Sequence, residues 1–187
     1  MPVPLFEITA RAAKIRLLLS DCDGVMTDGG IYYSADGKRV FEVTKVFNIH
    51  DGQGFRLAQE AGLKIGIISG RASPALAARA RELQIDYLYQ GVAHKIAVYE
   101  QIKATEGLQD EEIAYLGDDL PDLGPMRRAG LSIAVADAVP EIRDCAHFLT
   151  NKNGGRGAVR EAIEMILKAK GRWEELILRY DDKENTK

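Results

Sequence analysis

The chain has 187 residues, of which 46% are hydrophobic and 28% are charged, and its formal net charge is −3. This length and composition predict one soluble globular domain, residues 1–187, with a full hydrophobic core. A net negative charge does not favour a nucleic-acid partner, which would require a basic face. No apolar run approaches the roughly 20 residues needed to cross a bilayer, so we expect no membrane partner.

The cysteines and the first residues bear on the cellular compartment. Cys22 and Cys145 lie far apart and show no CxxC or histidine-rich spacing, which disfavours zinc and a disulfide framework. Cys22 stands between two aspartates after an apolar run and is expected to be a small buried side chain. The segment 1–13 contains Glu7 and Arg11 and is not a signal peptide. We therefore expect a cytoplasmic protein.

Short apolar runs alternate with longer amphipathic segments along most of the chain. The apolar runs predict buried strands at Ile15–Ser20, Leu63–Ile68, Tyr87–Tyr89, Ile113–Leu116 and Leu131–Ala134. The segments between them predict helices at Gly52–Ala61, Pro74–Leu83, Lys95–Glu106 and Leu120–Ala129, and the last pattern predicts a long surface helix at Ala158–Ala169. This alternation predicts an α/β fold: a Rossmann-like parallel sheet with helices on both faces.

Residues 29–48 interrupt the alternation and predict a β-hairpin. The runs Ile31–Tyr33 and Val40–Val46 flank a turn at Ala35-Asp36-Gly37. Asp-Gly between two β-rich runs is a strong hairpin signal. Because a lone two-stranded hairpin is marginally stable in water, we expect this one to pack against something.

The sequence shows no internal repeat, low-complexity linker or second core, so we expect no separate cap domain. Residues 171–187 form a C-terminal extension in which Trp173 and Tyr180 are expected to pack. The final stretch, 181–187, is polar and is expected to be frayed.

Ligands of open α/β sheets bind at the carboxyl ends of the strands, where the polar residues of this sequence gather. The first predicted strand is followed by Asp21 and Asp23, which can converge on one cation, although such pairs are common in solvated turns. The second is followed by Ser69, whose hydroxyl can bind a phosphate oxygen or simply cap the next helix.

Two further groups follow the later strands. Lys95 begins the helix after the third strand and, taken alone, would be read as a solvated lysine. The fourth strand ends in Gly117-Asp118-Asp119-Leu120-Pro121-Asp122, and three carboxylates this close repel one another unless a cation or hydrogen bonds offset the charge. A helix N-terminus also favours acidic residues, so capping is the competing interpretation.

The order DxD, Ser, Lys and GDDxxD resembles that of phosphatases of the haloacid dehalogenase superfamily. The resemblance implies that Asp21 attacks phosphorus and becomes a phospho-aspartate, and that Asp23 protonates the leaving alcohol and then activates water. It implies that Ser69 and Lys95 bind the phosphoryl oxygens.

The same resemblance implies a magnesium ion, a hard cation that prefers oxygen ligands. The ion would be held by the carboxylates of Asp21 and Asp118 and by the carbonyl of Asp23. Asp119 and Asp122 would support these ligands or supplement them.

The segments DxDGVMTDG, FNIHDGQG, ISGR, YLYQG, GDDLPD and GGRGAVRE are similar to those of a narrower family, the phosphatases of 3-deoxy-D-manno-octulosonate 8-phosphate, over roughly residues 15–167. These enzymes act on a lipopolysaccharide precursor in Gram-negative bacteria. The resemblance implies a capless homotetramer in which each hairpin helps to cover a neighbouring active site.

The narrower resemblance also implies which residues contact the small sugar-acid phosphate. Besides Asp23 and Lys95 they are Asn48, Ile49, His50, Asp51, Gly52, Arg56, Arg71 and Arg79. Guanidinium groups suit the carboxylate of such a substrate because they can form paired hydrogen bonds with it.

Sequence position alone supports some of these substrate-binding residues more strongly than others. Arg56 and Arg79 fall in predicted helices, where a solvated face is the alternative, whereas Arg71 is placed by the motif after Ser69. His50 is expected to act through its backbone or at a helix start, not in catalysis. Residues 154–157 are either a loop before the last helix or part of an active-site mouth.

Three other interpretations compete with this one. A receiver-type signalling module also gathers aspartates, Ser/Thr and Lys around magnesium, but its phospho-accepting aspartate lies on a middle strand, where this chain has Ser69. A catalytically silent oligomerisation domain is disfavoured because the catalytic residues are present. A phosphatase of a nine-carbon ulosonate 9-phosphate is the closest alternative, although such relatives tend to have glutamate where this chain has Arg71.

Overall fold

A computed structural model describes residues 3–35 and 40–181, with the backbone alone at residues 34–35 and 40–43. The strands are β1 (Leu17–Ser20), β2 (Tyr32–Ala35), β3 (Val40–Thr44), β4 (Lys64–Ile68), β5 (Tyr87–Tyr89), β6 (Ile113–Gly117), β7 (Leu131–Ala134) and β8 (Phe148–Leu149). The α-helices are α1 (Leu5–Ala12), α2 (Ile49–Glu60), α3 (Pro74–Glu82), α4 (Lys95–Glu106), α5 (Leu123–Arg128), α6 (Pro140–Cys145), α7 (Ala158–Ala169) and α8 (Trp173–Asp181), with short 3₁₀ helices η1 (Asp110–Glu112) and η2 (Leu120–Asp122).

Six strands form one sheet in the order β5-β4-β1-β6-β7-β8, and all neighbouring pairs are parallel. The predicted α/β fold with a parallel sheet is therefore confirmed. The sixth strand, β8, was not predicted because two residues are too short to show a periodicity. β5 was predicted to be buried, but it lies at the sheet edge and its residues are only half-buried.

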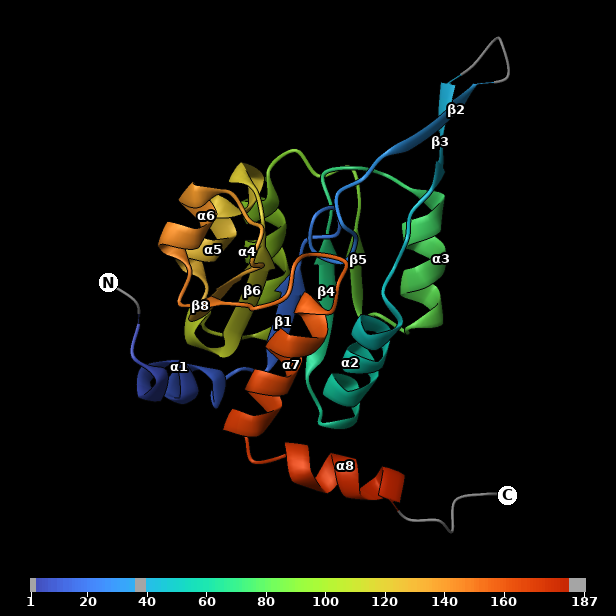
Figure 1. The fold of residues 1–187 in the computed structure, drawn as a ribbon. Helices are drawn as coiled ribbons and strands as arrows, with labels where there is room; N and C mark the ends of the chain where they lie inside the picture. Colours follow the sequence, from blue (N-terminus) through green and yellow to red (C-terminus); the bar gives the residue numbers. More distant parts are fainter. Residues whose placement is uncertain (1–2, 36–39, 182–187) are drawn as a thin grey trace.

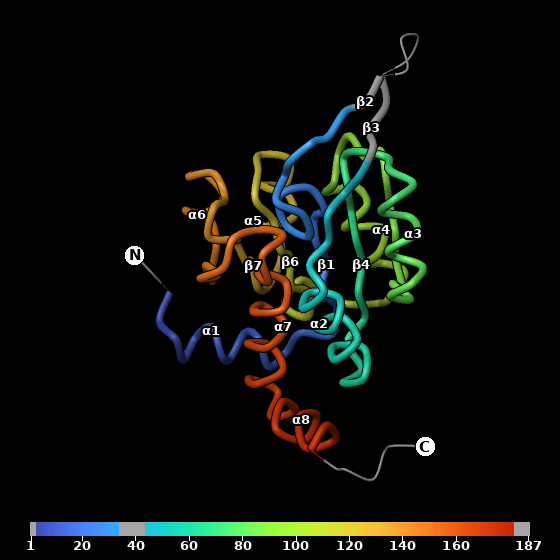
Figure 2. Tube along the Cα trace, turned by 45° about the vertical axis from the view of Figure 1, so that its right-hand side comes forward, coloured from blue at the N-terminus to red at the C-terminus, as the bar shows by residue number. Residues whose placement is uncertain are grey.

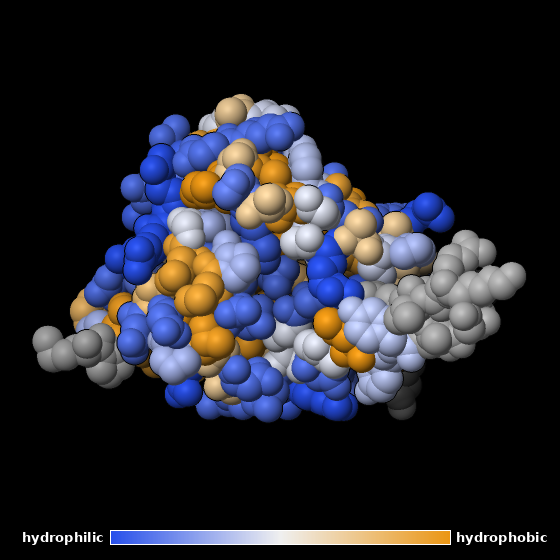
Figure 3. Space-filling view, turned by 90° about the horizontal axis from the view of Figure 1, so that it is seen from above, coloured by the Kyte–Doolittle hydropathy of each residue, from blue (hydrophilic) through white to orange (hydrophobic). Residues whose placement is uncertain are grey.

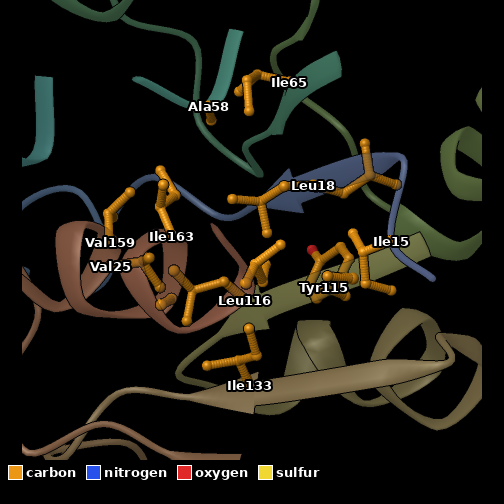
Figure 4. Close-up of a cluster of buried hydrophobic side chains, with 14 of the residues drawn as sticks. Ile15, Leu18, Val25, Ala58, Ile65, Tyr115, Leu116, Ile133, Val159 and Ile163 are labelled. Atoms are coloured by element: carbon orange, nitrogen blue, oxygen red, sulfur yellow. The ribbon is translucent and has the colours of Figure 1, made fainter. Parts of the chain in front are cut away.

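Helices cover the sheet in two groups (Figure 1). α1, α7 and α2 pack in a row on one side, while α4, α5 and α6 pack against one another on the other side. Between the first group and the sheet, Leu18 of β1 and Leu116 of β6 lie close to Val159 and Ile163 of α7 (Figure 4). This dry core fixes the strands and so fixes the loops that leave their carboxyl ends.

Several helices differ from the sequence prediction. α1, α6 and α8 were not predicted, in part because α6 has only six residues. The segment Leu120–Ala129 is not one helix, since it divides into η2 and α5. The helix Ala158–Ala169 has the predicted bounds, but it is less a surface helix than a core helix, because six of its twelve residues are buried.

β2 and β3 pair antiparallel and form a ribbon that projects from the sheet (Figures 1 and 2). Side chains near the ribbon's base remain exposed, including Ile31, Tyr32, Tyr33 and Val46. The predicted turn at residues 35–37 lies mostly outside the described residues, as does most of the predicted frayed stretch 181–187. In the part of the chain that the structure describes, no helix has the length and apolar character to span a membrane.

Candidate active site

The loops that leave β1, β4 and β6 lie side by side, because these strands are adjacent and in register. Ser20 pairs with Ile67 of β4 and with Leu116 of β6, so the residues that follow the three strands meet at one edge of the sheet. Asp21 follows β1, Ser69 follows β4 and Asp118 follows β6. Seen from this end, the surface is largely hydrophilic with apolar patches between (Figure 3).

Asp122 is the structural centre of the acidic cluster. It is fully buried, and its Oδ1 accepts hydrogen bonds from Lys95 Nζ at 2.7 Å and Tyr115 Oη at 2.8 Å. Its Oδ2 accepts the backbone N–H groups of Asp118 at 3.1 Å and Asp119 at 3.4 Å. Asp122 therefore ties the lysine to the loop after β6.

Lys95 links this support to the predicted nucleophile. Its Nζ lies 2.7 Å from Asp21 Oδ1 as well as 2.7 Å from Asp122 Oδ1. Burial alone would lower the pKa of Lys95, but the two carboxylates together raise it above its usual range. Lys95 is thus a buried ammonium held by two anions, and not the solvated lysine that its isolated sequence position allowed.

Carboxylate oxygens of Asp21, Asp118 and Asp122 lie within 4.8 Å of one another, a separation that one cation can bridge. Both oxygens of Asp122 already accept hydrogen bonds, whereas Asp118 Oδ1 is buried and has no hydrogen-bond partner. A buried carboxylate oxygen without a partner is costly unless a cation or proton satisfies it. The donor set, all oxygen, fits magnesium, with Asp21 and Asp118 as the available carboxylate ligands.

The pKa values of these carboxylates show how strongly the site demands positive charge. Burial raises the pKa of Asp21, Asp122 adds to the rise, and Lys95 opposes it. Burial also raises the pKa of Asp118, and Asp21 and Asp122 reinforce the effect. A bound divalent ion would favour the ionised carboxylates of Asp21 and Asp118 and so oppose these rises.

Gly24 lets the loops after β1 and β6 approach each other. Its φ is +90°, and a Cβ at this position would lie 2.0 Å from Asp118 Oδ2. A side chain here would both strain the backbone and displace a metal-ligand candidate. Gly154 approaches the same loop from the other side, because its Cβ would lie 1.7 Å from the carbonyl oxygen of Gly24. Residues 154–157 therefore brace the loop that contains Asp21 and Asp23.

Ser69 is buried, and its hydroxyl organises the turn after β4. Ser69 Oγ donates to the carbonyl oxygen of Arg71 at 3.0 Å and accepts the backbone N–H of Arg71 at 3.2 Å. The backbone of Arg71 is thus part of the turn that follows β4, the strand next to β1.

Asp23 is paired with a lysine that the sequence motifs did not single out. Lys45 Nζ forms an ion pair with Asp23 Oδ1, and the Lys45 side chain is only 4% exposed. Lys45 stands near the end of the β-rich run Val40–Val46, where a lysine normally points to solvent, so no sequence signal distinguished it. The ion pair becomes evident only in the fold, where the chain after β3 returns to the loop after β1.

The predicted substrate residues at the start of α2 have different surroundings. Asn48 caps this helix by accepting the N–H of His50 at 2.8 Å, so His50 has the predicted helix-start role. Asp51 is buried, and its Oδ1 accepts the N–H of Arg160 at 2.8 Å. Burial raises the pKa of Asp51, while that N–H and the N–H of Gly157 oppose the rise. Asp51 thus fixes the start of α7.

The predicted arginines and Asp119 lie in different parts of the surface. Arg79 packs over Gly52, where a Cβ would lie 2.2 Å from Arg79 Nη2, and with Ile49 it lines a surface hollow between the base of the ribbon and α3. Arg56 is exposed and lies in another hollow with residues 82–84. Asp119 is exposed and caps η2. The structure thus gathers Asp21, Asp118, Asp122 and Lys95, whereas Arg56 lies in another hollow and the side chain of Asp119 is exposed.

A parallel sheet with a buried Asp–Lys–Asp cluster at its carboxyl edge suits a hydrolase that handles phosphate. The family model described as haloacid dehalogenase-like hydrolase matches residues 88–163. This segment contains both Lys95 and the three acidic residues that follow β6.

Relatives that match most of the chain define the family more narrowly. The 3-deoxy-D-manno-octulosonate 8-phosphate phosphatase of Yersinia pestis is 45% identical over 168 residues, which cover 90% of this chain and 88% of that protein. The chain therefore belongs to the family of 3-deoxy-D-manno-octulosonate 8-phosphate phosphatases.

Solved structures agree with this assignment. The Moraxella catarrhalis phosphatase of this family, solved in complex with magnesium ion, phosphate ion and KDO, superposes with a TM-score of 0.89 at 37% identity, covering 93% of this chain and 98% of that one. The cobalt-bound Haemophilus influenzae phosphatase gives a TM-score of 0.84 at 33% identity, covering 90% and 99%.

Proposed function

We propose that this chain is a magnesium-dependent phosphomonoesterase that hydrolyses 3-deoxy-D-manno-octulosonate 8-phosphate to the free sugar acid and phosphate. The observation that carries the proposal is the buried Lys95 bound to both Asp21 and Asp122 beside the unpartnered oxygen of Asp118. The membership of the chain in this phosphatase family supports the substrate.

The side chains divide the chemistry between them. Asp21 attacks phosphorus, and a phospho-aspartate forms while Asp23 protonates the leaving alcohol and later activates water. Lys95 and Ser69 hold the phosphoryl oxygens, and Lys95 also offsets negative charge around Asp21. Asp122 keeps Lys95 in place through Oδ1, while its Oδ2 accepts the backbone N–H of Asp118 in the loop after β6.

The proposed magnesium site is formed by oxygen atoms that lie close together at the sheet edge. Asp21 and Asp118 supply carboxylate oxygens and Asp23 supplies its carbonyl oxygen, while Asp122 and Asp119 support the loop. A bound magnesium ion would neutralise charge on the transferring phosphoryl group. The presence of a magnesium ion in the Moraxella catarrhalis relative supports this assignment.

The substrate's sugar acid extends beyond the phosphate, and we assign its contacts to the loop after β4 and the start of α2. Arg71 and Gly52 are the best supported, because Arg71 lies in the turn after β4 and Gly52 packs against Arg79. Asn48 supports the same region as the N-cap of α2. Ile49, His50, Arg79 and Arg56 belong to the same proposal, with Arg56 the weakest because it is exposed in another hollow. Asp51 contributes indirectly, through the start of α7.

Assembly follows from the ribbon. The whole chain is proposed to act as one capless domain that forms a homotetramer, in which the ribbon at residues 29–48 covers a neighbouring site. The exposed side chains of Ile31, Tyr32, Tyr33 and Val46 support this, since association would bury them. We also propose a cytoplasmic location, and the two free cysteines suit a reducing compartment.

The alternatives are now weaker. A silent oligomerisation domain would not need the buried Lys95 cluster, and a receiver module would not place Ser69 after the strand next to β1. A nine-carbon ulosonate 9-phosphate stays the closest competitor, because it offers the same phosphate and carboxylate. Arg71 and the intact segment 154–161 favour the eight-carbon substrate.

A phosphate-release screen tests the proposal. Wild-type protein is assayed on eight-carbon and nine-carbon ulosonate phosphates, simple sugar phosphates and 4-nitrophenyl phosphate, with magnesium and after chelation. We expect the highest kcat/KM on the eight-carbon substrate and loss of activity after chelation. A preference for the nine-carbon compound would make that compound the substrate in place of the eight-carbon one. Full activity without divalent metal would reject the mechanism.

A further inference from the structure

Lys45 lies between β3 and α2, and the chain there returns from the ribbon to the sheet edge. Its side chain is 4% exposed, and its ammonium contacts Asp23 Oδ1, 22 positions earlier in the sequence. A lysine this buried is held by an anion, since an unpaired ammonium would be costly there. The contact therefore links the base of the ribbon directly to the loop after β1.

The cluster thus has two lysines on two different aspartates. Lys95 lies 2.7 Å from Asp21 Oδ1, and Lys45 pairs with Asp23. In the reaction proposed above, Asp21 acts on the attacking side of phosphorus and Asp23 on the leaving-group side. Positive charge is therefore present on both sides of the transferring group.

The first chemical step changes the charge beside Lys45. A bond forms between an Asp21 carboxylate oxygen and phosphorus, and the bond from phosphorus to the alkyl oxygen breaks. The electron pair of that bond stays on the alkyl oxygen, which takes the proton of Asp23. Asp23 enters this step carrying a proton taken up from solvent, gives it to the alkyl oxygen, and returns to the carboxylate that pairs with Lys45 in the structure. The ion pair with Lys45 is therefore restored as the alcohol leaves. An interaction that strengthens along the step lowers its barrier.

We propose that Lys45 is a positioning residue for the leaving-group acid: it orients the Asp23 carboxyl and stabilises the carboxylate that forms when the alcohol departs. This inference rests on the proposed phosphatase mechanism. Its consequence is a dependence on the leaving group. Primary alkyl phosphates need the proton from Asp23, whereas 4-nitrophenolate leaves without one.

The test compares wild type, Lys45→Met and Lys45→Arg on a primary alkyl phosphate that the wild type hydrolyses and on 4-nitrophenyl phosphate. The quantity measured is kcat/KM, which reports the steps up to departure of the alcohol. We expect Lys45→Met to lose on the order of 10²-fold on the alkyl phosphate, as removal of assistance to a general acid does. The loss on the aryl phosphate should be below about 3-fold, and Lys45→Arg should recover most of the alkyl activity.

Lys64→Met is the matched control, because Lys64 is 49% exposed, pairs with Glu106 and lies away from the site. It should leave both substrates unaffected, and thermal unfolding confirms that each variant is folded. Equal losses on both substrates, or no loss on either, would overturn the role of Lys45. Wild-type activity on other alkyl phosphates but not on the eight-carbon ulosonate phosphate would reject the proposed substrate and still leave the Lys45 comparison readable.

Discussion

The carboxyl edge of the sheet and the β2–β3 ribbon are opposites in what they bury and expose. At the sheet edge, charged groups are buried: Asp122 is fully buried, and Lys95 is held by two carboxylates at 2.7 Å. On the ribbon, apolar groups are exposed: Tyr33 is 60% exposed and Val46 is 58% exposed. A bound cation would satisfy the sheet edge, and in the proposed assembly a partner surface would cover the apolar groups of the ribbon.

Lys45 joins the two regions. It stands at the base of the ribbon, yet its ammonium reaches Asp23 in the loop after β1. A change at the base of the ribbon would therefore alter the ion pair of Asp23, the proposed leaving-group acid, whereas Lys95 is bound to Asp122 at the sheet edge. We expect substitutions at the sheet edge to affect every substrate and substitutions on the ribbon to affect large substrates selectively.

Replacement of the proposed nucleophile, Asp21, should have the largest effect. Asp21→Asn removes the attacking carboxylate, so turnover should fall by at least about 10⁴-fold on both sugar and aryl phosphates. The fold should persist, and thermal stability should hold or rise, because burial and Asp122 raise the pKa of Asp21 and make its charged form costly. Phosphate release and thermal unfolding measure the two effects, and appreciable turnover by the pure variant would contradict the assignment.

Two neighbouring aspartates offer a matched pair within the sheet edge. Asp122→Asn keeps the shape but weakens the support of Lys95 and the loop N–H groups, so activity should fall by about 10- to 100-fold. Asp119→Asn changes an exposed cap and should cost less than about 3-fold. Steady-state assays at several magnesium concentrations measure both variants. Similar losses of activity in the two variants would contradict the different roles assigned to the buried Asp122 and the exposed Asp119.

The sheet edge was largely predictable from sequence, while its connection to the ribbon was not. Short apolar runs predicted five of the six strands of the parallel sheet, and the order of the motifs brought Asp21, Lys95 and Asp118 together. Strand pairing forces residues after adjacent strands into proximity, so local patterns were sufficient. Lys45 follows an irregular ribbon, and no local periodicity states where its side chain points. β8 was missed because of its length.

A substitution on the ribbon should have a smaller and selective effect. Tyr33→Asp places a charge on an exposed aromatic site of the ribbon, so oligomers that bury this surface should dissociate. Activity on the eight-carbon sugar phosphate should fall on the order of 10-fold, with aryl phosphate activity nearly unchanged, since only the larger substrate needs a covered site.

Light scattering and assays on both substrates test the ribbon. Tyr180→Asp is the control, because Tyr180 is similarly exposed, at 62%, but lies on α8 at the opposite end of the molecule (Figure 1). A fully active wild-type monomer would refute the proposed assembly, and loss of assembly in both variants would show that the effect is not specific to the ribbon.

The smallest expected effect concerns the pH dependence of stability without metal. Burial, with Asp21 and Asp122, raises the pKa of Asp118 from 3.8 to about 8. Between these values the folded protein retains a proton that the unfolded chain has released. Stability of the metal-free protein should therefore decrease as pH rises from about 4 to 8. Magnesium favours the ionised carboxylates, so its stabilising effect should increase over the same range.

Thermal unfolding at pH 5.5 and pH 8, each with chelator and with magnesium, measures this linkage. We expect magnesium to raise the melting temperature more at pH 8, by on the order of 5 °C, since each kcal/mol shifts a domain of this size by about 2–4 °C. Asp118→Asn removes the titrating group, so its metal-free protein should show a flatter decline between the two pH values and little response to magnesium. If the wild type gains equally from magnesium at both pH values, proton release from Asp118 is not linked to metal binding, and the unpartnered oxygen of Asp118 requires another explanation.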